Sequence, residues 1–315
     1  MLSGYQVRPA TVDDAQIIFE VQAAHETPLI GGPNATLADV VDELTEPDWC
    51  PATDGWLVHH ESGQAVGWGW ACRKAGSANV DIGVYTRPGH EKVADHLWQR
   101  AQQRAAELSR ESGHDTVTID IGVYPQDRLV RGLAAVHGFE PAATFVRMRI
   151  DHPGLIGYPQ PPAGVSLRDG SQEQVRRDAN AVRNESFAGH FGFVEKTYQQ
   201  WASDREASSA HDWNMVHVAY ADGEPAAVVV RTNNFVPDEN CGYVLTLGTS
   251  PKFQGQGLGS LLLRHAFAAD AEAGRAGTIL HVDTNPQRPA LNLYRRNGMR
   301  DILTIDVWRR LMPSR

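Results

Sequence analysis

The chain has 315 residues, a formal net charge of −9 at pH 7 and a hydrophobic content of 42%. This length is enough for two domains, and the composition is typical of a soluble globular protein. The acidic balance argues against a nucleic-acid-binding surface, and no apolar run approaches the length of a membrane span.

The cysteine pattern and the N-terminus favour the cytoplasm. Cys50, Cys72 and Cys241 are scattered, so they predict neither a disulfide framework nor a Cys-x-x-Cys site. The first residues lack the basic-then-apolar pattern of a signal peptide.

The first half of the chain alternates short β-branched segments with amphipathic stretches, which predicts an α/β fold. The clearest helix has Leu97, Ala101, Ala105 and Leu108 on one face. We expect strands at 7–10, 57–58, 66–71, 80–85, 117–123 and 145–150, and helices at 15–24, 90–112 and 129–136.

The second half repeats this order at a constant offset. Arg168 follows Arg8 by 160 residues (168 − 8 = 160), and Gly298 follows Gly138 by the same number (298 − 138 = 160). A constant offset between landmarks predicts two copies of one fold. The predicted organisation is an N-terminal domain at 1–155, a proline-rich linker at 156–163 and a C-terminal domain at 164–315.

A glycine-rich junction stands between a predicted strand at 243–247 and a predicted helix whose apolar stripe is Leu258, Leu261, Leu262, Ala266 and Ala269. It has the sequence Gln254-Gly255-Gln256-Gly257-Leu258-Gly259-Ser260. Glycine lets the backbone approach a ligand closely, and the first turn of a helix offers unpaired N–H groups at the positive end of its dipole. The junction therefore predicts a diphosphate site. A glycine turn that only joins strand to helix is the alternative.

Two other phosphate-binding motifs use similar glycines. A Walker-type loop ends in Gly-Lys-Ser/Thr, and the absence of lysine at Gly259-Ser260 excludes it. A dinucleotide fingerprint needs a third glycine where Ser260 stands. Asp283 follows the next predicted strand, at 278–282, and resembles the ribose-binding acid of that motif, so this alternative is weakened and stays open.

Together with the sequence downstream, the junction resembles the GNAT acetyltransferase superfamily. Gln254, Gly257 and Gly259 match the motif Gln/Arg-x-x-Gly-x-Gly/Ala. Leu293-Tyr294 and Gly298-Met299 match a later Leu-Tyr and Gly-Phe pair, with methionine in place of phenylalanine. Each motif alone is weak, whereas both in order at this separation are specific.

The two copies make the chain similar to actinobacterial tandem GNAT acetyltransferases of the mycothiol synthase type. A local match supports this resemblance, because the segment 184–190 follows the pattern Asn-Glu-x-Phe-Ala-x-His of that group. In the mycothiol synthase type this histidine precedes Pro-Glu-Gln, whereas here Phe191-Gly192-Phe193 follows. The acceptor chemistry at this loop is therefore expected to differ.

The resemblance implies a fold and a reaction. The fold is α/β (α+β), with two tandem GNAT-like domains, each a mixed, mostly antiparallel twisted sheet flanked by helices. The implied enzyme is an acyltransferase that moves an acetyl group from acetyl-CoA to the amine of a small-molecule acceptor by direct attack, in the C-terminal domain. No metal, nucleic acid or membrane is expected to take part.

The resemblance also implies site residues. Tyr294 is the implied acid that protonates the thiolate, and Glu185 is a second catalytic candidate. Glu185 and His190 are implied to line the acceptor site. The implied cofactor contacts are Leu247, Gly248, Thr249, Gln254, Gly255, Gln256, Gly257, Leu258, Gly259, Ser260, Asn285, Asn292 and Tyr294.

The first copy departs from the family pattern. It has residues 86–91 in place of the glycine series and, by the offset, Ala134 in place of Tyr294. We therefore expect it to be a degenerate, mainly structural copy. For the whole chain, the alternative to an enzyme is a non-catalytic acyl-CoA-binding sensor or scaffold.

The remaining histidines are interpreted as structural. His217 and His281 lie on predicted strands, where a core role is the usual one. The pair His59-His60 lacks a third ligand at useful spacing, so no metal site is predicted.

Overall fold

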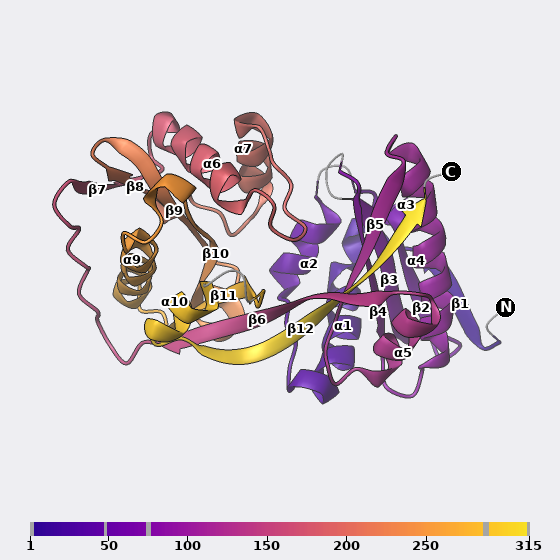
Figure 1. The fold of residues 1–315 in the computed structure, drawn as a ribbon. Helices are drawn as coiled ribbons and strands as arrows, with labels where there is room; N and C mark the ends of the chain where they lie inside the picture. Colours follow the sequence, from indigo (N-terminus) through magenta and orange to yellow (C-terminus); the bar gives the residue numbers. More distant parts are fainter. Residues whose placement is uncertain (1–2, 47–48, 74–76, 286–289, 314–315) are drawn as a thin grey trace. The chain divides into compact units, whose positions relative to one another are not determined.

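A computed structural model describes residues 3–46, 49–73, 77–285 and 290–313. The chain forms two compact units, and each is described here by itself (Figure 1). Unit 1 comprises Met1–Thr144 and Thr304–Arg315, and unit 2 comprises Phe145–Leu303. Among the described residues, no helix combines the length and apolar character that crossing a membrane requires.

Unit 1 begins with β1 (Tyr5–Pro9), a short 3-10 turn and α1 (Ala15–Ile30). The elements that follow are α2 (Leu37–Leu44), α3 (Pro51–Asp54), β2 (Gly55–His60), β3 (Ala65–Arg73), β4 (Asn79–Thr86), α4 (Lys92–Glu111), β5 (Thr116–Val123), α5 (Arg128–Val136) and β6 (Glu140–Asp151). Apolar residues of α4 and α5 cover one face of the sheet, and those of α1 and α2 cover the other.

Unit 2 has the same arrangement. Its elements are β7 (Val165–Asp169), α6 (Glu173–Phe187), α7 (Tyr198–Ala207), β8 (Val216–Ala221), β9 (Glu224–Thr232), α8 (Val236–Glu239), β10 (Cys241–Thr249), α9 (Leu258–Glu272), β11 (Gly277–Asp283), α10 (Ala290–Arg296) and β12 (Arg300–Pro313). Helices α9 and α10 pack on one face of the sheet, and α6 and α7 pack on the other.

The two sheets have the same topology. In unit 1 the strand order is β1-β2-β3-β4-β5-β12, and in unit 2 it is β7-β8-β9-β10-β11-β6. Neighbouring strands are antiparallel except for one parallel pair in each unit, β4 with β5 and β10 with β11. This order agrees with the constant offset of 160 residues in the sequence.

The strand at the end of each sheet comes from the other half of the chain. The end of β12 pairs with β5, from Asp306↔Val123 to Pro313↔Thr116. The guanidinium of Arg309 on β12 donates two hydrogen bonds of 2.7 Å to the Asp120 carboxylate on β5. In unit 2, the end of β6 pairs with β11, from Phe145↔Asp283 to Asp151↔Gly277.

The exchange of strands moves the division between the units. The sequence placed it at a linker of residues 156–163, whereas the compact units divide at residues 144/145 and 303/304. The reason is that β6 and β12 each run from one unit into the other. A proline-rich segment indicates where the chain lacks regular secondary structure. It gives no information on which of the two sheets a neighbouring strand pairs with.

Candidate functional site

The parallel strands β10 and β11 separate towards their carboxyl ends. They pair from Cys241↔Gly277 to Val244↔Leu280, and no further pair between them occurs in the described part of the chain. On its other side, β10 remains paired with β9 as far as Thr249↔Ala227. The end of β10 therefore presents unpaired backbone groups towards β11, which an extended ligand with amide groups can pair with.

A β-bulge lies where the strands begin to separate. The pairing of β10 with β9 shifts register between Val244 and Thr246, so Leu245 has no partner in the ladder. A bulge bends the strand and increases its twist, which carries the end of β10 away from its neighbour. The sequence analysis missed this bulge, because no residue type in 243–247 marks it.

A buried ion pair holds the opposite, paired end of these strands together. Arg231 on β9 donates to Asp270 on α9 at 2.8 Å, and the Thr278 hydroxyl on β11 donates to the same carboxylate at 2.6 Å. A side chain at Gly242 on β10 would collide with this carboxylate, so glycine is required there. The strands are thus fixed at one end and open at the other.

The first turn of α9 stands beside the open end of β10. Gly257 precedes the helix with φ +82°, and no side chain caps the helix start. Gly255 has φ +79°, and a Cβ added at either glycine would meet no atom within 4 Å. The space in front of the helix start is therefore open to a ligand, and the backbone N–H groups of the first turn point into it.

Two contacts fix the position of this helix start. A Cβ at Gly259 would lie 3.3 Å from Leu293 Cδ2 on α10 and 3.6 Å from Thr249 Oγ1 on β10, so the helix start packs closely against both elements. The Ser260 hydroxyl donates to Asn297 Oδ1 at 2.9 Å. The buried side chain of Leu258 anchors the turn in the core.

Tyr294 lies on α10 in the same apolar core as Leu258, and its side chain is buried. Among the described residues no partner hydrogen-bonds to its hydroxyl, and burial raises the pKa of that hydroxyl above the usual value of 10. The phenol therefore keeps its proton throughout the neutral and alkaline range. Such a group can donate a proton to a leaving group but does not act as a base.

The last turn of α6 packs against the end of β10. A Cβ at Gly248 would lie 2.8 Å from Ser186 Cβ and 3.0 Å from Phe187 Cε2. The implied acceptor residue Glu185 directly precedes Ser186 in the chain, and it is exposed. The ring centroid of His190 lies 4.8 Å from that of Phe187, so the loop after α6 folds back on the same helix.

The structure places the other expected cofactor contacts less tightly. The backbone N–H of Asn285 donates to Asp283 Oδ1 at 2.9 Å, in a turn that follows β11. Gln254 Nε2 donates to the Thr249 carbonyl at 3.4 Å. Gln256 and Asn292 are exposed. Among the expected contacts, Leu247, Leu258 and Tyr294 belong to one apolar cluster, and Thr249 packs beside Gly259. The described residues include no group of three or more His, Cys, Asp or Glu placed to hold a metal ion.

Unit 1 has a corresponding separation between β4 and β5, but side chains of its own close it. The strands pair only from Asn79↔Thr118 to Asp81↔Asp120, although β4 continues to Thr86. His25 on α1 contacts the Thr86 carbonyl through Nδ1 at 3.2 Å and Asp127 Oδ2 through Nε2 at 3.0 Å. One imidazole thus bridges the end of β4 to the start of α5.

Further hydrogen bonds satisfy the buried groups beside this bridge. The hydroxyl of Tyr124 donates to Glu26 Oε1 at 2.8 Å, and the backbone N–H of Asn34 donates to Glu26 Oε2 at 2.7 Å. β4 also pairs with β3 without a register shift, and the ring of Trp70 lies so close over Gly83 that a Cβ there would collide with it.

The start of α4 in unit 1 differs from the start of α9 in unit 2. The residue before the helix is Glu91, whose carboxylate accepts a hydrogen bond from the Gly89 backbone N–H at 2.9 Å. Hydrogen bonds from its own backbone N–H and from that of Gly89 lower the pKa of this carboxyl group, so it is ionised at neutral pH. An ionised carboxylate therefore stands directly before α4, where a glycine stands before α9.

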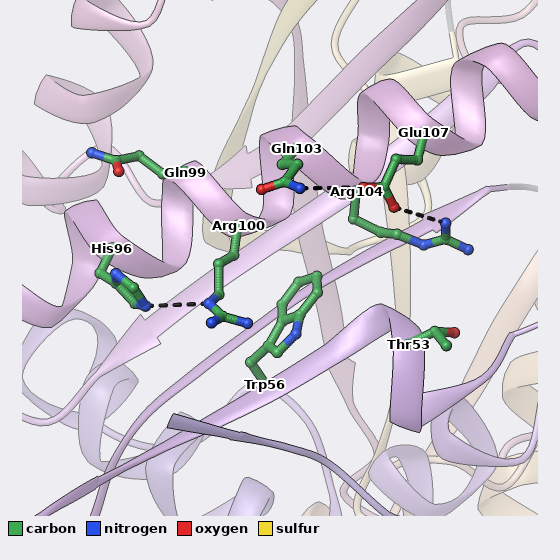
Figure 2. Close-up of a pocket in the computed structure, with 8 residues that line it drawn as sticks. All are labelled: Thr53, Trp56, His96, Gln99, Arg100, Gln103, Arg104 and Glu107. Carbon is green, nitrogen blue, oxygen red and sulfur yellow. Dashed lines mark hydrogen bonds and ion pairs between the residues drawn. The ribbon is translucent and has the colours of Figure 1, made fainter. Parts of the chain in front are cut away.

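A polar pocket of about 410 Å³ lies elsewhere on unit 1, along α4 (Figure 2). Figure 2 shows Arg100 beside His96, and Arg104 paired with Glu107. Arg104 also pairs with Asp54 at 2.7 Å, so the pocket balances much of its own charge. Its lining residues are Thr53, Trp56, His96, Gln99, Arg100, Gln103, Arg104 and Glu107, and none of them is an expected site residue.

The comparison with family models addresses unit 2 directly. The model of the acetyltransferase (GNAT) family matches residues 180–299, which contain the open end of β10, the start of α9 and Tyr294. The chain contains a GNAT domain. The expectation from the glycine-rich junction and the later Leu-Tyr and Gly-Met pairs is therefore confirmed at the level of the family.

Two similar proteins match this chain over most of its length. The chain is 26% identical to the mycothiol acetyltransferase of Cellulomonas flavigena over 318 residues, covering 92% of this chain and 83% of that protein. A GCN5-related N-acetyltransferase from Sphaerobacter thermophilus superposes with a TM-score of 0.85 at 18% identity, covering 99% of this chain and 97% of that one.

A tandem GNAT protein from the clavulanic acid biosynthesis pathway superposes with a TM-score of 0.71 at 16% identity, and 99% of each chain is covered. These likenesses confirm the predicted α/β fold with two GNAT-like units, each built on a mixed, mostly antiparallel sheet.

Proposed function

We propose that the protein is an N-acetyltransferase that moves an acetyl group from acetyl-CoA to the amine of a small-molecule acceptor, with its active site in unit 2. One observation carries the proposal: the uncapped start of α9 lies beside the unpaired end of β10. These two features fit the two ends of coenzyme A, a diphosphate and an amide-rich arm. Unit 1 has neither feature in an open form.

The residues present fit the cofactor. The backbone N–H groups between Gly255 and Ser260 would hold the diphosphate, because an uncapped helix start binds anions without a Lys or Arg side chain. The backbone of Leu247, Gly248 and Thr249 would pair with the pantetheine amides, as an added strand pairs with a sheet edge. Acetyl-CoA supplies a thioester, whose carbon is attacked by the acceptor amine.

Tyr294 would act as the acid of the reaction. The thiolate that leaves needs a proton, and a buried phenol with a raised pKa holds one at neutral pH. Because a thiol with a pKa of about 8.5 is already a good leaving group, losing this acid slows the reaction but does not abolish it. Glu185 and His190 would contact the acceptor; Glu185 is exposed and precedes Ser186, which packs against Gly248.

The acceptor is proposed to be a small amine. The relative named mycothiol acetyltransferase makes mycothiol-related amines the first compounds to test. The aromatic residues that follow His190 favour an acceptor pocket whose walls differ from those of the mycothiol synthase type. The ring centroids of Phe193 and Phe187 are 5.8 Å apart, and those of Phe191 and Phe145 are 6.4 Å apart.

Two measurements test the proposal. Acetyl-CoA should raise the melting temperature of the protein, and free thiol should appear when the right amine is added. The Tyr294→Phe variant should keep the thermal shift and lose between about tenfold and 100-fold in thiol release. Binding of acetyl-CoA without thiol release for any amine would favour a sensor or scaffold instead, and stabilisation by NAD in its place would favour a dinucleotide site.

A further inference from the structure

Tyr243 on β10 and His281 on β11 form a pair that the proposed reaction has not used. The Tyr243 hydroxyl and His281 Nδ1 lie 3.0 Å apart, and the ring centroids are 5.7 Å apart in an edge-to-face arrangement. Both side chains are half-buried. The other strand histidine, His217, is also half-buried, but its ring packs against another imidazole, that of His265, with the ring centroids 4.5 Å apart.

The pair stands where β10 and β11 begin to separate. The last paired residues of the two strands are Val244 and Leu280, so Tyr243 and His281 lie on either side of that point. Val244 and Leu280 point into the core beneath α9. Because side chains alternate along a strand, Tyr243 and His281 point to the opposite face, on which α6 packs.

The surroundings keep the imidazole neutral. Burial lowers the pKa of His281 to about 4, and the positive charge of Arg147 on β6 acts in the same direction. Arg147 is itself paired with Glu239 on α8, and Arg149 on β6 donates to the same carboxylate at 3.0 Å. Among the described residues, no partner hydrogen-bonds to Nε2 of His281, so this nitrogen is available to a bound molecule.

We propose that His281 is the general base that takes the proton from the acceptor amine, and that Tyr243 is a positioning residue that holds its ring. The inference rests on the proposed function of unit 2. In the required tautomer Nδ1–H donates to the Tyr243 oxygen, which leaves the lone pair of Nε2 directed to the amine. The sequence interpretation of His281 as structural is revised by this inference.

The step is balanced in atoms and charge. The amine nitrogen forms a bond to the carbonyl carbon, and the carbon–sulfur bond breaks. The amine proton moves to His281 Nε2, while the proton of Tyr294 moves to the sulfur. Exchange with solvent then restores both groups. A weak base is sufficient, because the nitrogen becomes positively charged on attack and so releases its proton readily.

The test uses the full chain with three variants, His281→Gln, Tyr243→Phe and the control His217→Gln. Thiol release is followed with the amine that gives the highest wild-type rate in a panel, and acetyl-CoA binding is followed by thermal shift. His281→Gln should lower kcat by about 100-fold and Tyr243→Phe by about tenfold, with the KM for acetyl-CoA and the thermal shift unchanged. His217→Gln should keep kcat within about twofold.

Chemical rescue separates a base from a structural residue. In a His281→Gly variant, added imidazole should raise kcat at least about tenfold over the same variant without imidazole. The reason is that imidazole supplies the missing base in the space left by the side chain. Turnover of His281→Gln within about threefold of the wild-type rate overturns the inference alone. Loss of the acetyl-CoA thermal shift, or no rescue, assigns His281 to structure and also overturns it. Absence of turnover in the wild type with every amine overturns the proposed function together with the inference.

Discussion

The two units have the same strand order and the same separated parallel pair, but they treat the open end of that pair in opposite ways. In unit 1, His25 connects the end of β4 to Asp127, and Glu91 places a carboxylate at the start of α4. In unit 2 the start of α9 is uncapped and glycines surround it. This fold therefore does not need a ligand for its stability, because side chains can bridge the separated strands and place a charge at the helix start.

The strand pairing shows the same difference. β10 has a bulge at Leu245, whereas β4 pairs with β3 in one continuous register. A bulge leaves backbone groups without partners, and such groups are tolerated where a ligand or solvent satisfies them. Unit 2 thus has a bulged strand and an open strand end, while unit 1 has a continuous ladder at the corresponding strand.

The largest effect is expected from breaking the ion pair that fixes the closed end of the strands in unit 2. Asp270→Asn leaves the buried guanidinium of Arg231 without its countercharge, which should lower the free energy of unfolding of unit 2 by about 3 kcal/mol. Calorimetry measures the change. The control Glu173→Gln removes an exposed pair with Arg177 and should change stability by less than about 0.5 kcal/mol. Equal effects of the two variants would contradict the assigned role of Asp270.

A second variant gives unit 2 the carboxylate that unit 1 carries. Gly257→Glu places an acidic side chain immediately before α9, as Glu91 stands before α4. Repulsion of the phosphates and the loss of the open space should weaken acetyl-CoA binding by about 100-fold, or about 2.7 kcal/mol. Titration calorimetry measures the affinity.

The matched control for this variant is Gly274→Glu. Gly274 follows the other end of α9, also has a positive φ, of +71°, and also has open space around it. Both variants carry the same backbone strain of about 1–2 kcal/mol. Only the substitution at Gly257 should affect binding, and a similar loss in both would show that strain, rather than the carboxylate, is responsible.

Acid should weaken unit 1 through an ion pair that has no counterpart at the same offset in unit 2. The guanidinium of Arg8, followed by hydrogen bonds from Thr11, lowers the pKa of Asp14 from 3.8 to about 2. A carboxyl group whose pKa is lower in the folded than in the unfolded chain stabilises the fold at pH values above its unfolded pKa. That stability is therefore lost as the pH falls from about 4 to about 2.

The variant Asp14→Asn should remove this acid dependence and lower the stability of unit 1 at pH 7 by about 1 kcal/mol. At the equivalent positions of unit 2, Gln174 replaces the acid and Arg168 lies over the ring of Tyr220 at 4.6 Å. Hydrogen exchange between pH 2 and 5 measures the stability of each unit in the wild type and in Asp14→Asn. An unchanged acid profile in Asp14→Asn would exclude Asp14 as its source.

The smallest effect is expected from removing the carboxylate of unit 1. Glu91→Gln should not produce a second acetyl-CoA site, because His25 and Asp127 still close the separated strands. Titration of the variant should give the same stoichiometry as the wild type. A second equivalent of bound acetyl-CoA would show that charge alone had closed unit 1.

Local patterns in the sequence predicted several elements within a few residues. The expected helix at 90–112 is α4 at Lys92–Glu111, and the expected strand at 278–282 is β11 at Gly277–Asp283. In the predicted stripe of α9, Leu258, Leu261, Leu262 and Ala266 are buried and Ala269 is half-buried. These features depend on residue spacing within one segment, which is why they are legible in the sequence.

Features that depend on a distant partner were not legible. The sequence indicated that residues 86–91 lack the glycine series, but not that Glu91 accepts a hydrogen bond at the helix start. It assigned His281 and His217 the same structural role, and only their neighbours distinguish them. The bulge at Leu245 follows from pairing with β9, so the residue itself carries no signal.

By itself the sequence determined the repeat, the glycine-rich junction and the family motifs, because each is a matter of spacing and residue type along the chain. Tertiary structure alone decided that β6 and β12 complete each other's sheets, that the strands of unit 2 stay open while those of unit 1 are bridged, and that Tyr243 and His281 meet. The physical reason is that hydrogen bonds and packing join residues by distance in space, and those distances exist only once the two sheets have formed.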